Sequence, residues 1–178
     1  LVAEGANIVV RIPGKSDISK KIILGAHYDC YGGPGANDNA TGVACLLEAA
    51  RVLSGLSFKN TIEIIFFTGE DIPDGDLGSK FYLRQLSQEE KQNVLSVFIV
   101  DMIGNNQGVN ESAGEEDLNI MYDEAGLSHD LSDSIALVIT SSVSGLLVKV
   151  GLDSGYDSDD DEFQLAGIPT LLFCEDTR

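Results

Sequence analysis

The 178-residue chain has an ordinary globular composition, with 43% hydrophobic and 22% charged residues, which excludes a disordered or fibrous protein. A chain of this length fits one domain that buries roughly two-thirds of its unfolded surface. Its 29 acidic and 11 basic residues give a formal net charge of -18, which disfavours nucleic acid and anionic membranes as partners but suits metal ions or a cationic ligand group.

Short apolar segments alternate with segments of helical periodicity along the chain. The predicted strands cover 7–12, 21–26, 61–68, 97–101, 118–122, 146–150 and 170–174. The predicted helices cover 43–53, 77–87, 129–141 and 159–166. Several strands are apolar on both faces, as in a sheet covered by helices on both sides. We therefore expect a single domain over 1–178 with a three-layer α/β/α sandwich around a mixed, mostly parallel sheet.

Three of the predicted strands run directly into residues that can bind a metal, namely His27, the pair Glu70 and Asp71, and Asp101. Asp38 lies where the glycine-rich loop after His27 enters the next helix. Ligands of open α/β sheets bind beyond the carboxyl ends of the strands. We therefore expect these five side chains to converge at one edge of the sheet.

Zinc is bound by imidazole nitrogen and carboxylate oxygen, and a site with two ions about 3.5 to 4 Å apart needs a carboxylate that bridges them. One histidine and three aspartates supply such a ligand set: His27, Asp38, Asp71 and Asp101. Such a site lowers the pKa of a bound water and polarises a carbonyl oxygen, which is the chemistry of amide hydrolysis. Glu70 is placed to take the proton of the water and pass it to the leaving amine.

Each of these residues also has a purely structural interpretation. Asp38, taken singly, is typical of a helix N-cap that accepts backbone N–H groups. His27 can be satisfied by Asp29 or by a backbone carbonyl, and Glu70 can be a solvated acid. Asp101 is harder to explain in this way, because a charge directly after a buried strand must be satisfied. A metal site is absent only if the structural interpretation is correct for every one of these residues.

Five sequence motifs occur in an order and spacing that resemble one enzyme family. They are GAHYD, PGANDNATGVACLLEAARVL, FFTGED with DLGSKFY, VDMIG and YDSDDDEFQLAGIPTLLF. The pattern resembles the di-zinc aminopeptidase family, which includes bacterial leucyl aminopeptidases, glutamate carboxypeptidase and the glutaminyl cyclases. The resemblance runs from about Asn7 to Phe173, nearly the whole chain.

The resemblance implies a metallo-exopeptidase that removes amino-terminal residues from peptides with two zinc ions. It implies that His27 and Asp101 bind one ion, Asp71 binds the other, and Asp38 bridges them. Glu70 is then the general base. The resemblance also implies that Asp29 holds the His27 ring, the usual arrangement for a metal-bound imidazole. Family members are commonly exported, which slightly favours export over a cytoplasmic location.

The chain departs from the family pattern at three places. Glu70 and Asp71 stand where two glutamates are usual, so the shorter Asp71 must reach further. Asp160 stands where a histidine is common and is a candidate pocket residue that alters substrate choice; alternatively, Ser158 and Asp161 form a capping box there. The last zinc ligand of the family, a histidine after the final strand, does not occur in the 178 residues. We expect a truncation before that ligand, since the second metal site is otherwise incomplete.

Two other functions stay open at this point. A glutaminyl cyclase-like enzyme of the same family would use one zinc, but such enzymes typically carry a proline early in the helix where this chain has Thr41, Gly42 and Val43. A non-catalytic binding domain that has lost its metals shares the fold. The presence of the expected ligands favours the peptidase over both. The sequence carries no signature of side-chain specificity or oligomeric state.

Overall fold

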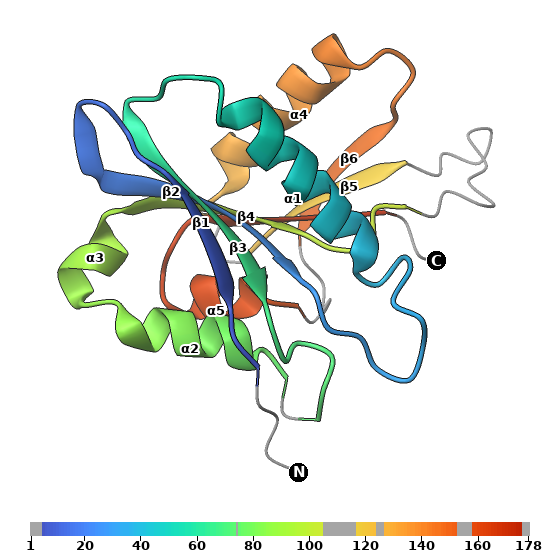
Figure 1. Cartoon of the computed structure of the whole chain (residues 1–178). Coiled ribbons are helices and arrows are strands. Elements are labelled where there is room, and N and C mark those ends of the chain that lie inside the picture. The colour runs from blue at the N-terminus through green and yellow to red at the C-terminus, as the bar shows by residue number, and fades with distance from the viewer. Residues whose placement is uncertain (1–4, 74, 105–116, 124–126, 153–157, 176–178) are drawn as a thin grey trace.

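The computed structural model describes residues 5–73, 75–104, 117–123, 127–152 and 158–175 (Figure 1). The strands in these residues are β1 (Ile8–Ile12), β2 (Asp17–His27), β3 (Asn60–Phe67), β4 (Val94–Val100), β5 (Leu118–Tyr122), β6 (Val148–Leu152) and β7 (Thr170–Cys174). The helices are α1 (Ala40–Leu53), α2 (Leu77–Gln85), α3 (Gln88–Gln92), α4 (His129–Ser142) and α5 (Asp160–Leu165). None of the described helices has the length and apolar character needed to cross a membrane.

The described strands form one mixed sheet in the order β1-β3-β2-β4-β7-β5-β6. β2 pairs in parallel with β3 and β4, and β4 pairs in parallel with β7. β5 and β6 are also parallel, whereas β1 runs antiparallel to β3 and β5 runs antiparallel to β7. The predicted mixed, mostly parallel sheet is confirmed.

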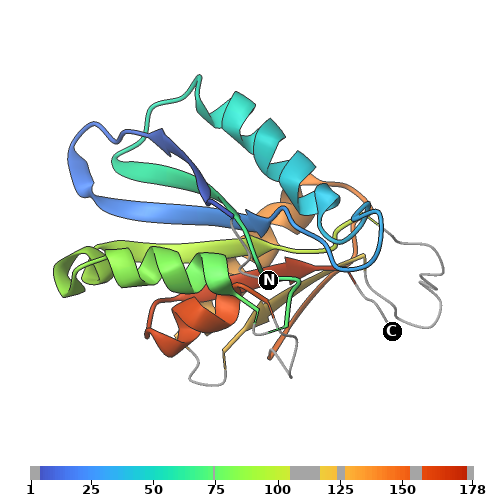
Figure 2. The ribbon, with the colours of Figure 1, turned by 60° about the horizontal axis from the view of Figure 1, so that its bottom comes forward.

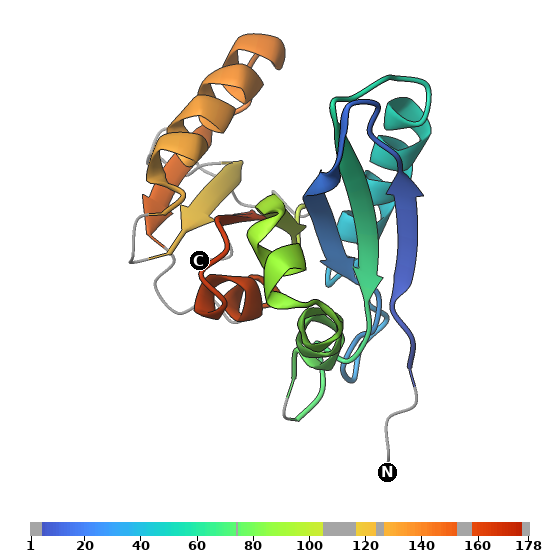
Figure 3. The same cartoon turned by 90° about the vertical axis from the view of Figure 1, so that its left-hand side faces the viewer.

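Helices cover both faces of the sheet, which confirms the three layers. α1 lies over one face of β2 and β3, while α2 and α5 lie on the opposite face (Figure 2). Figure 3 shows α1 and α2 on opposite sides of these strands. α4 contacts β5 and β6 at the other end of the sheet.

The doubly apolar β3 explains why both faces are covered. Phe66 belongs to the core cluster that contains Leu46 of α1. Phe67, the next residue, points to the opposite face, where its ring lies 6.4 Å from Tyr82 of α2 and 6.0 Å from Phe163 of α5. Burying one large apolar side chain contributes about 1.5 to 3 kcal/mol. The two cores therefore fix β3 between the helical layers.

The predicted elements are all present, with ends that differ by a few residues. The short helix α3 was not predicted, because none of its residues is buried and it carries no apolar periodicity. The sequence signal for α3 is a capping box. The hydroxyl of Ser87 accepts the backbone N–H of Glu90, and the carboxylate of Glu90 accepts the backbone N–H of Ser87.

Candidate metal centre

The site lies where the parallel strands β2, β3 and β4 end. His27 is the last residue of β2 and pairs with Phe67, the last residue of β3. Glu70 follows three residues after Phe67. Gly25 of β2 pairs with Ile99 of β4, so His27 and Asp101 leave the sheet side by side. His27 is 1% exposed and Asp101 is 3% exposed. The predicted convergence at the carboxyl edge is therefore present for residues far apart in the sequence.

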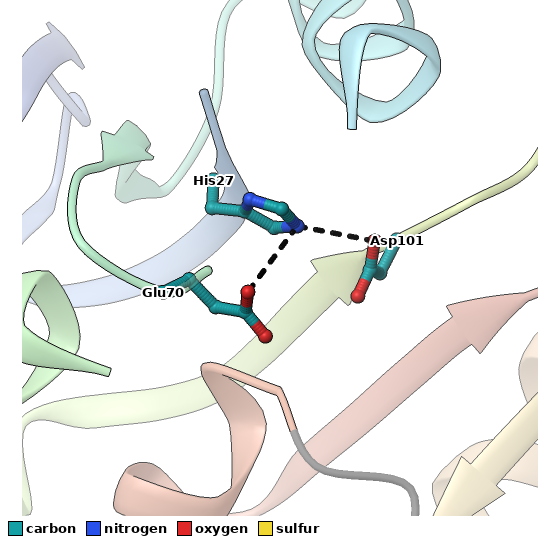
Figure 4. A group of neighbouring side chains, drawn as sticks. All are labelled: His27, Glu70 and Asp101. Carbon is teal, nitrogen blue, oxygen red and sulfur yellow. Dashed lines mark hydrogen bonds and ion pairs between the residues drawn. The ribbon is translucent and has the colours of Figure 1, made fainter. Parts of the chain in front are cut away.

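The His27 ring is the centre of this convergence. Its Nε2 lies 3.2 Å from Asp38 Oδ1, 3.3 Å from Asp101 Oδ1 and 3.8 Å from Glu70 Oε2. Figure 4 shows Glu70 and Asp101 approaching the ring from two neighbouring segments. Three carboxylates thus surround one imidazole nitrogen.

The donor atoms fall into two groups that share the histidine. Those of His27, Glu70 and Asp101 lie within 4.8 Å of one another, and so do those of His27, Asp38 and Asp71. Zinc binds nitrogen and oxygen at about 2.0 to 2.2 Å, which puts two ligands of one tetrahedral ion about 3.4 Å apart. The spacing and the chemistry of these side chains therefore fit zinc.

Asp29 organises the turn that carries Glu70 and Asp71. Its Oδ1 accepts the N–H groups of Gly69 at 2.9 Å and Glu70 at 3.3 Å, and its Oδ2 accepts that of Asp71 at 3.2 Å. The backbone carbonyl oxygen of Asp29 lies 3.1 Å from His27 Nδ1, whereas its carboxylate oxygen lies 3.9 Å from that nitrogen. One residue thus fixes both the ring of His27 and the Glu70–Asp71 turn.

The structure settles the alternative interpretation of Asp38. The N-cap of α1 is Asn39, whose Oδ1 accepts the N–H of Gly42 at 2.9 Å. The interpretation of Asp38 as the helix cap is therefore wrong. Its carboxylate points instead to His27, and its side chain is 45% exposed.

The start of α5 contributes a contact that the sequence analysis missed. Ser158 Oγ donates a hydrogen bond of 3.1 Å to Asp101 Oδ2, which leaves Asp101 Oδ1 facing His27. The capping-box alternative for Ser158 and Asp161 is wrong: the N-cap is Asp159, and the hydroxyl of Ser158 is bonded to Asp101 instead. A local pattern could not reveal this bond, which joins residues 57 positions apart.

Asp160 is the first residue of α5 and is fully buried. Its Oδ2 accepts a hydrogen bond from Gln164 Nε2, one helical turn further on. It belongs to neither of the two donor groups found among the described residues. Its expected role in a substrate pocket stays a prediction. His129, the second histidine of the chain, is exposed at the start of α4.

The electrostatics of the site reflect its excess of acids. Burial raises the pKa of Glu70 to about 8, and the nearby charges of Asp101 and Asp71 add to this effect. Burial alone lowers the pKa of His27, but the hydrogen bond and charge of Asp101 outweigh it and raise the pKa to about 10. Burial also raises the pKa of Asp38. A bound cation would favour the ionised carboxylates and the neutral imidazole, and so oppose all three shifts.

Comparison with known proteins identifies the family. The sequence profile of Peptidase family M28 matches residues 7–178. The chain belongs to this family. Among relatives of the M28 chain, leucine aminopeptidase 1 of Aspergillus oryzae is 34% identical over 146 residues, which cover 72% of this chain and 36% of the relative. Aminopeptidase YwaD of Bacillus subtilis is 32% identical over 158 residues, which cover 85% of this chain and 31% of the relative.

Solved structures agree with this M28 assignment. The aminopeptidase from Aneurinibacillus sp. strain AM-1 has a TM-score of 0.78 and 31% identity, covering 96% of this chain and 39% of that one. A zinc aminopeptidase from Bacillus subtilis has a TM-score of 0.76 and 30% identity, covering 94% and 39%. The resemblance stated from the motifs is confirmed. The chain spans about a third of the length of the curated relatives it matches.

Proposed function

We propose that this M28 chain forms the metal-binding core of a zinc aminopeptidase that hydrolyses amino-terminal residues from peptides. The observation that carries the proposal is the position of His27 Nε2, 3.2 Å from Asp38 and 3.3 Å from Asp101 at the carboxyl edge of the sheet. The relatives named aminopeptidases and the solved zinc aminopeptidase support the same chemistry.

The proposal assigns a ligand role to four residues. His27 and Asp101 would hold one zinc ion, Asp71 would hold a second, and Asp38 would be a ligand of both. Bound zinc would lower the pKa of a water molecule and polarise the carbonyl of the scissile bond. The acidic surroundings of the site suit the ammonium group of a peptide amino terminus.

Glu70 moves the proton in this proposal. Its side chain is 10% exposed and lies next to His27, and Asp29 holds its backbone in place. A carboxylate there accepts a proton from the attacking water and gives it to the leaving amine. Burial favours the protonated form of Glu70, whereas a nearby cation favours the ionised form that acts as base.

Two residues orient the ligands without being ligands themselves. Asp29 holds the turn of Glu70 and Asp71 through three backbone N–H groups. Ser158 binds Asp101 Oδ2 and so directs Oδ1 toward His27. Such supporting hydrogen bonds fix the direction of a ligand and tune its basicity.

The test combines zinc content with turnover. We would purify the chain without chelators, measure zinc by elemental analysis, and follow cleavage of an aminoacyl p-nitroanilide. We expect bound zinc and cleavage in the parent, and a loss of about 10²- to 10⁴-fold in kcat with unchanged zinc content in Glu70→Ala. The exposed Glu89 of α3 provides a matched control, because Glu89→Gln also removes one negative charge.

Three outcomes would contradict the proposal. Cleavage that persists in Glu70→Ala would exclude this residue as the base. Zinc binding without cleavage by the parent would exclude catalysis by the chain. A chain that binds no zinc would favour the non-catalytic binding domain.

A further inference from the structure

Two asparagines flank Asp38, and both tie its backbone to the segment after β4. Asn39 Nδ2 donates to the carbonyl oxygen of Val100 at 2.8 Å, and its Oδ1 accepts the N–H of Met102 at 3.3 Å. Asn37 Oδ1 accepts the N–H of Gly104 at 2.9 Å. The bonds of these asparagines thus bracket Asp101 as well as Asp38. The relative position of the two aspartates depends on these contacts.

Glu175, directly after β7, joins the same network. Asn37 Nδ2 donates to Glu175 Oε1, across 138 positions of sequence. The backbone N–H of Glu175 donates to the carbonyl oxygen of Met102 at 3.1 Å. The residue is 3% exposed. Burying a carboxylate is costly unless it is hydrogen-bonded, so its bond to Asn37 is a strong constraint on both side chains.

The chemistry of a carboxylate decides which way the Asn37 amide points. The oxygen and nitrogen ends of an asparagine side chain have nearly the same shape, but an ionised carboxylate only accepts hydrogen bonds. Glu175 therefore selects the orientation in which Nδ2 faces it. Oδ1 is then left to accept the N–H of Gly104. In the reversed orientation, Asn37 Oδ1 would face the carboxylate of Glu175, acceptor against acceptor, and Nδ2 would face the N–H of Gly104, donor against donor.

Thr41 reinforces the same backbone from the first turn of α1. Its hydroxyl donates to the carbonyl oxygen of Asn37 at 2.7 Å and accepts the N–H of Ile103 at 3.1 Å. Asn37 is thus held through its side chain and its carbonyl oxygen. The peptide that enters Asp38 therefore has little freedom.

We propose that Glu175 is a positioning residue for the metal centre, which acts through Asn37 to set the distance between the bridging Asp38 and Asp101. The inference rests on the proposed function, because it concerns the affinity of that site for zinc. In this role Glu175 acts through Asn37 and is not itself a ligand of the metal. It determines the hydrogen-bonding direction of one amide, and that amide fixes the loop that carries Asp38.

An exchange of donor and acceptor tests this role. Asn37→Asp places a carboxylate against Glu175, so we expect repulsion and a zinc affinity about 10- to 100-fold weaker, the usual effect of losing a supporting contact. Adding Glu175→Gln restores a donor facing an acceptor, now in the opposite direction, and leaves the net charge as in the parent. The new carboxylate at position 37 can still accept the N–H of Gly104. We expect the double variant to regain most of the lost affinity.

Zinc affinity is measured by competition with a chromophoric chelator, and the visible spectrum of the cobalt(II)-loaded protein reports the ligand geometry. We expect the spectrum to change in Asn37→Asp and to return in the double variant. Glu175→Met alone removes both acceptor oxygens from a side chain of similar length and serves if Asn37→Asp does not fold; its zinc affinity should also fall. Glu89→Gln controls for the loss of one charge.

The outcomes separate this inference from the proposed function. A parent chain that binds no zinc overturns both. A parent that binds zinc, with single variants of equal affinity and equal cobalt spectrum, overturns only the role of Glu175. The same holds if the single variants lose affinity and the double variant does not regain it, because a general structural defect would not be reversed by exchanging the two groups.

Discussion

Two buried carboxylates on one strand and its continuation, Glu63 and Glu70, are treated in opposite ways by the fold. Glu63 lies in the middle of β3, is 2% exposed, and accepts a hydrogen bond from Tyr82 and ion pairs from Arg11 at 2.7 Å and Lys21 at 3.3 Å. Burial raises the pKa of Glu63, but these partners outweigh it and lower the pKa. The pKa of Glu70 is instead raised to about 8, chiefly by burial.

The difference separates a structural acid from a functional one. Glu63 has cations that match its charge, so the ionised form is stable without any ligand. Glu70 shares the single imidazole of His27 with Asp38 and Asp101, and its ionised form is stabilised further when a cation enters the site. A largely buried acid that shares its one cationic neighbour with other acids is therefore a better pointer to function than burial alone.

The largest expected effect is on catalytic turnover, which should depend on Glu70 and not on Glu63. Glu70→Gln should lower kcat by about 10²- to 10⁴-fold, because the proton carrier is lost. It should not lower the thermal midpoint of the metal-free protein, since a neutral amide is easier to bury there than a carboxylate. Steady-state kinetics and calorimetry check the two parts. A fall in stability with full activity would remove the contrast with Glu63.

The same substitution at Glu63 should have the reverse outcome. Glu63→Gln leaves Lys21, whose side chain is 12% exposed, without its charge partner. We expect the free energy of unfolding to fall by about 2 kcal/mol, as for other broken buried hydrogen bonds to charged groups. Zinc affinity should stay within about twofold of the parent, because Glu63 lies outside the site. Urea titration and chelator competition measure the two quantities.

A smaller effect is expected where a supporting hydrogen bond is lost. Ser158→Ala removes the donor to Asp101 Oδ2 but leaves all proposed ligands in place. We expect zinc affinity to fall about 10-fold, at the low end of the range for contacts that orient a ligand. Ser54→Ala, at the exposed end of α1, is the control. Unchanged affinity in Ser158→Ala would show that Asp101 needs no such support.

A further set of effects concerns the pH dependence of stability in the chelator-treated, metal-free protein. Because folding lowers the pKa of Glu63, its contribution is present above the unfolded pKa of about 4.3 and is lost as the pH falls through the lower folded value. Folding raises the pKa of Glu70 to about 8, so its contribution is present below the unfolded value and is lost as the pH rises through about 8. Urea midpoints from pH 3 to pH 9 measure both.

Each effect has its own reference variant. Glu63→Gln should flatten the acidic side of the profile. Glu70→Gln should make the fall in stability below about pH 8 less steep, and the contribution of His27, whose pKa is raised to about 10, should remain. A profile of either variant that follows the parent on the relevant side would contradict the assignment of that slope.

The sequence allowed the fold and the site edge to be predicted, because both follow from local patterns. Strands that are apolar on both faces define the layers, and an acid directly after such a strand marks the carboxyl edge. His27 and Asp101 could be found in this way, and their meeting across 74 positions follows from the parallel pairing of β2 with β4.

The contacts that support the site could not be predicted in the same way. Ser158 and Glu175 reach the site through long-range hydrogen bonds, and no periodicity marks such residues. The choice between Asp38 and Asn39 as the helix cap also depended on tertiary structure. Both residue types are good caps, and only the position of the backbone relative to β4 decides between them.

The central place of β2 in the sheet has a consequence for the order of folding. β2 pairs in parallel with β3 on one side and β4 on the other, so both neighbours must join it before His27 meets Glu70 and Asp101. Parallel pairings between distant segments form slowly, because the loop between them must close first. High-affinity uptake of zinc during refolding should therefore be a late event. The metal centre would then report that β3, β2 and β4 have joined into one sheet.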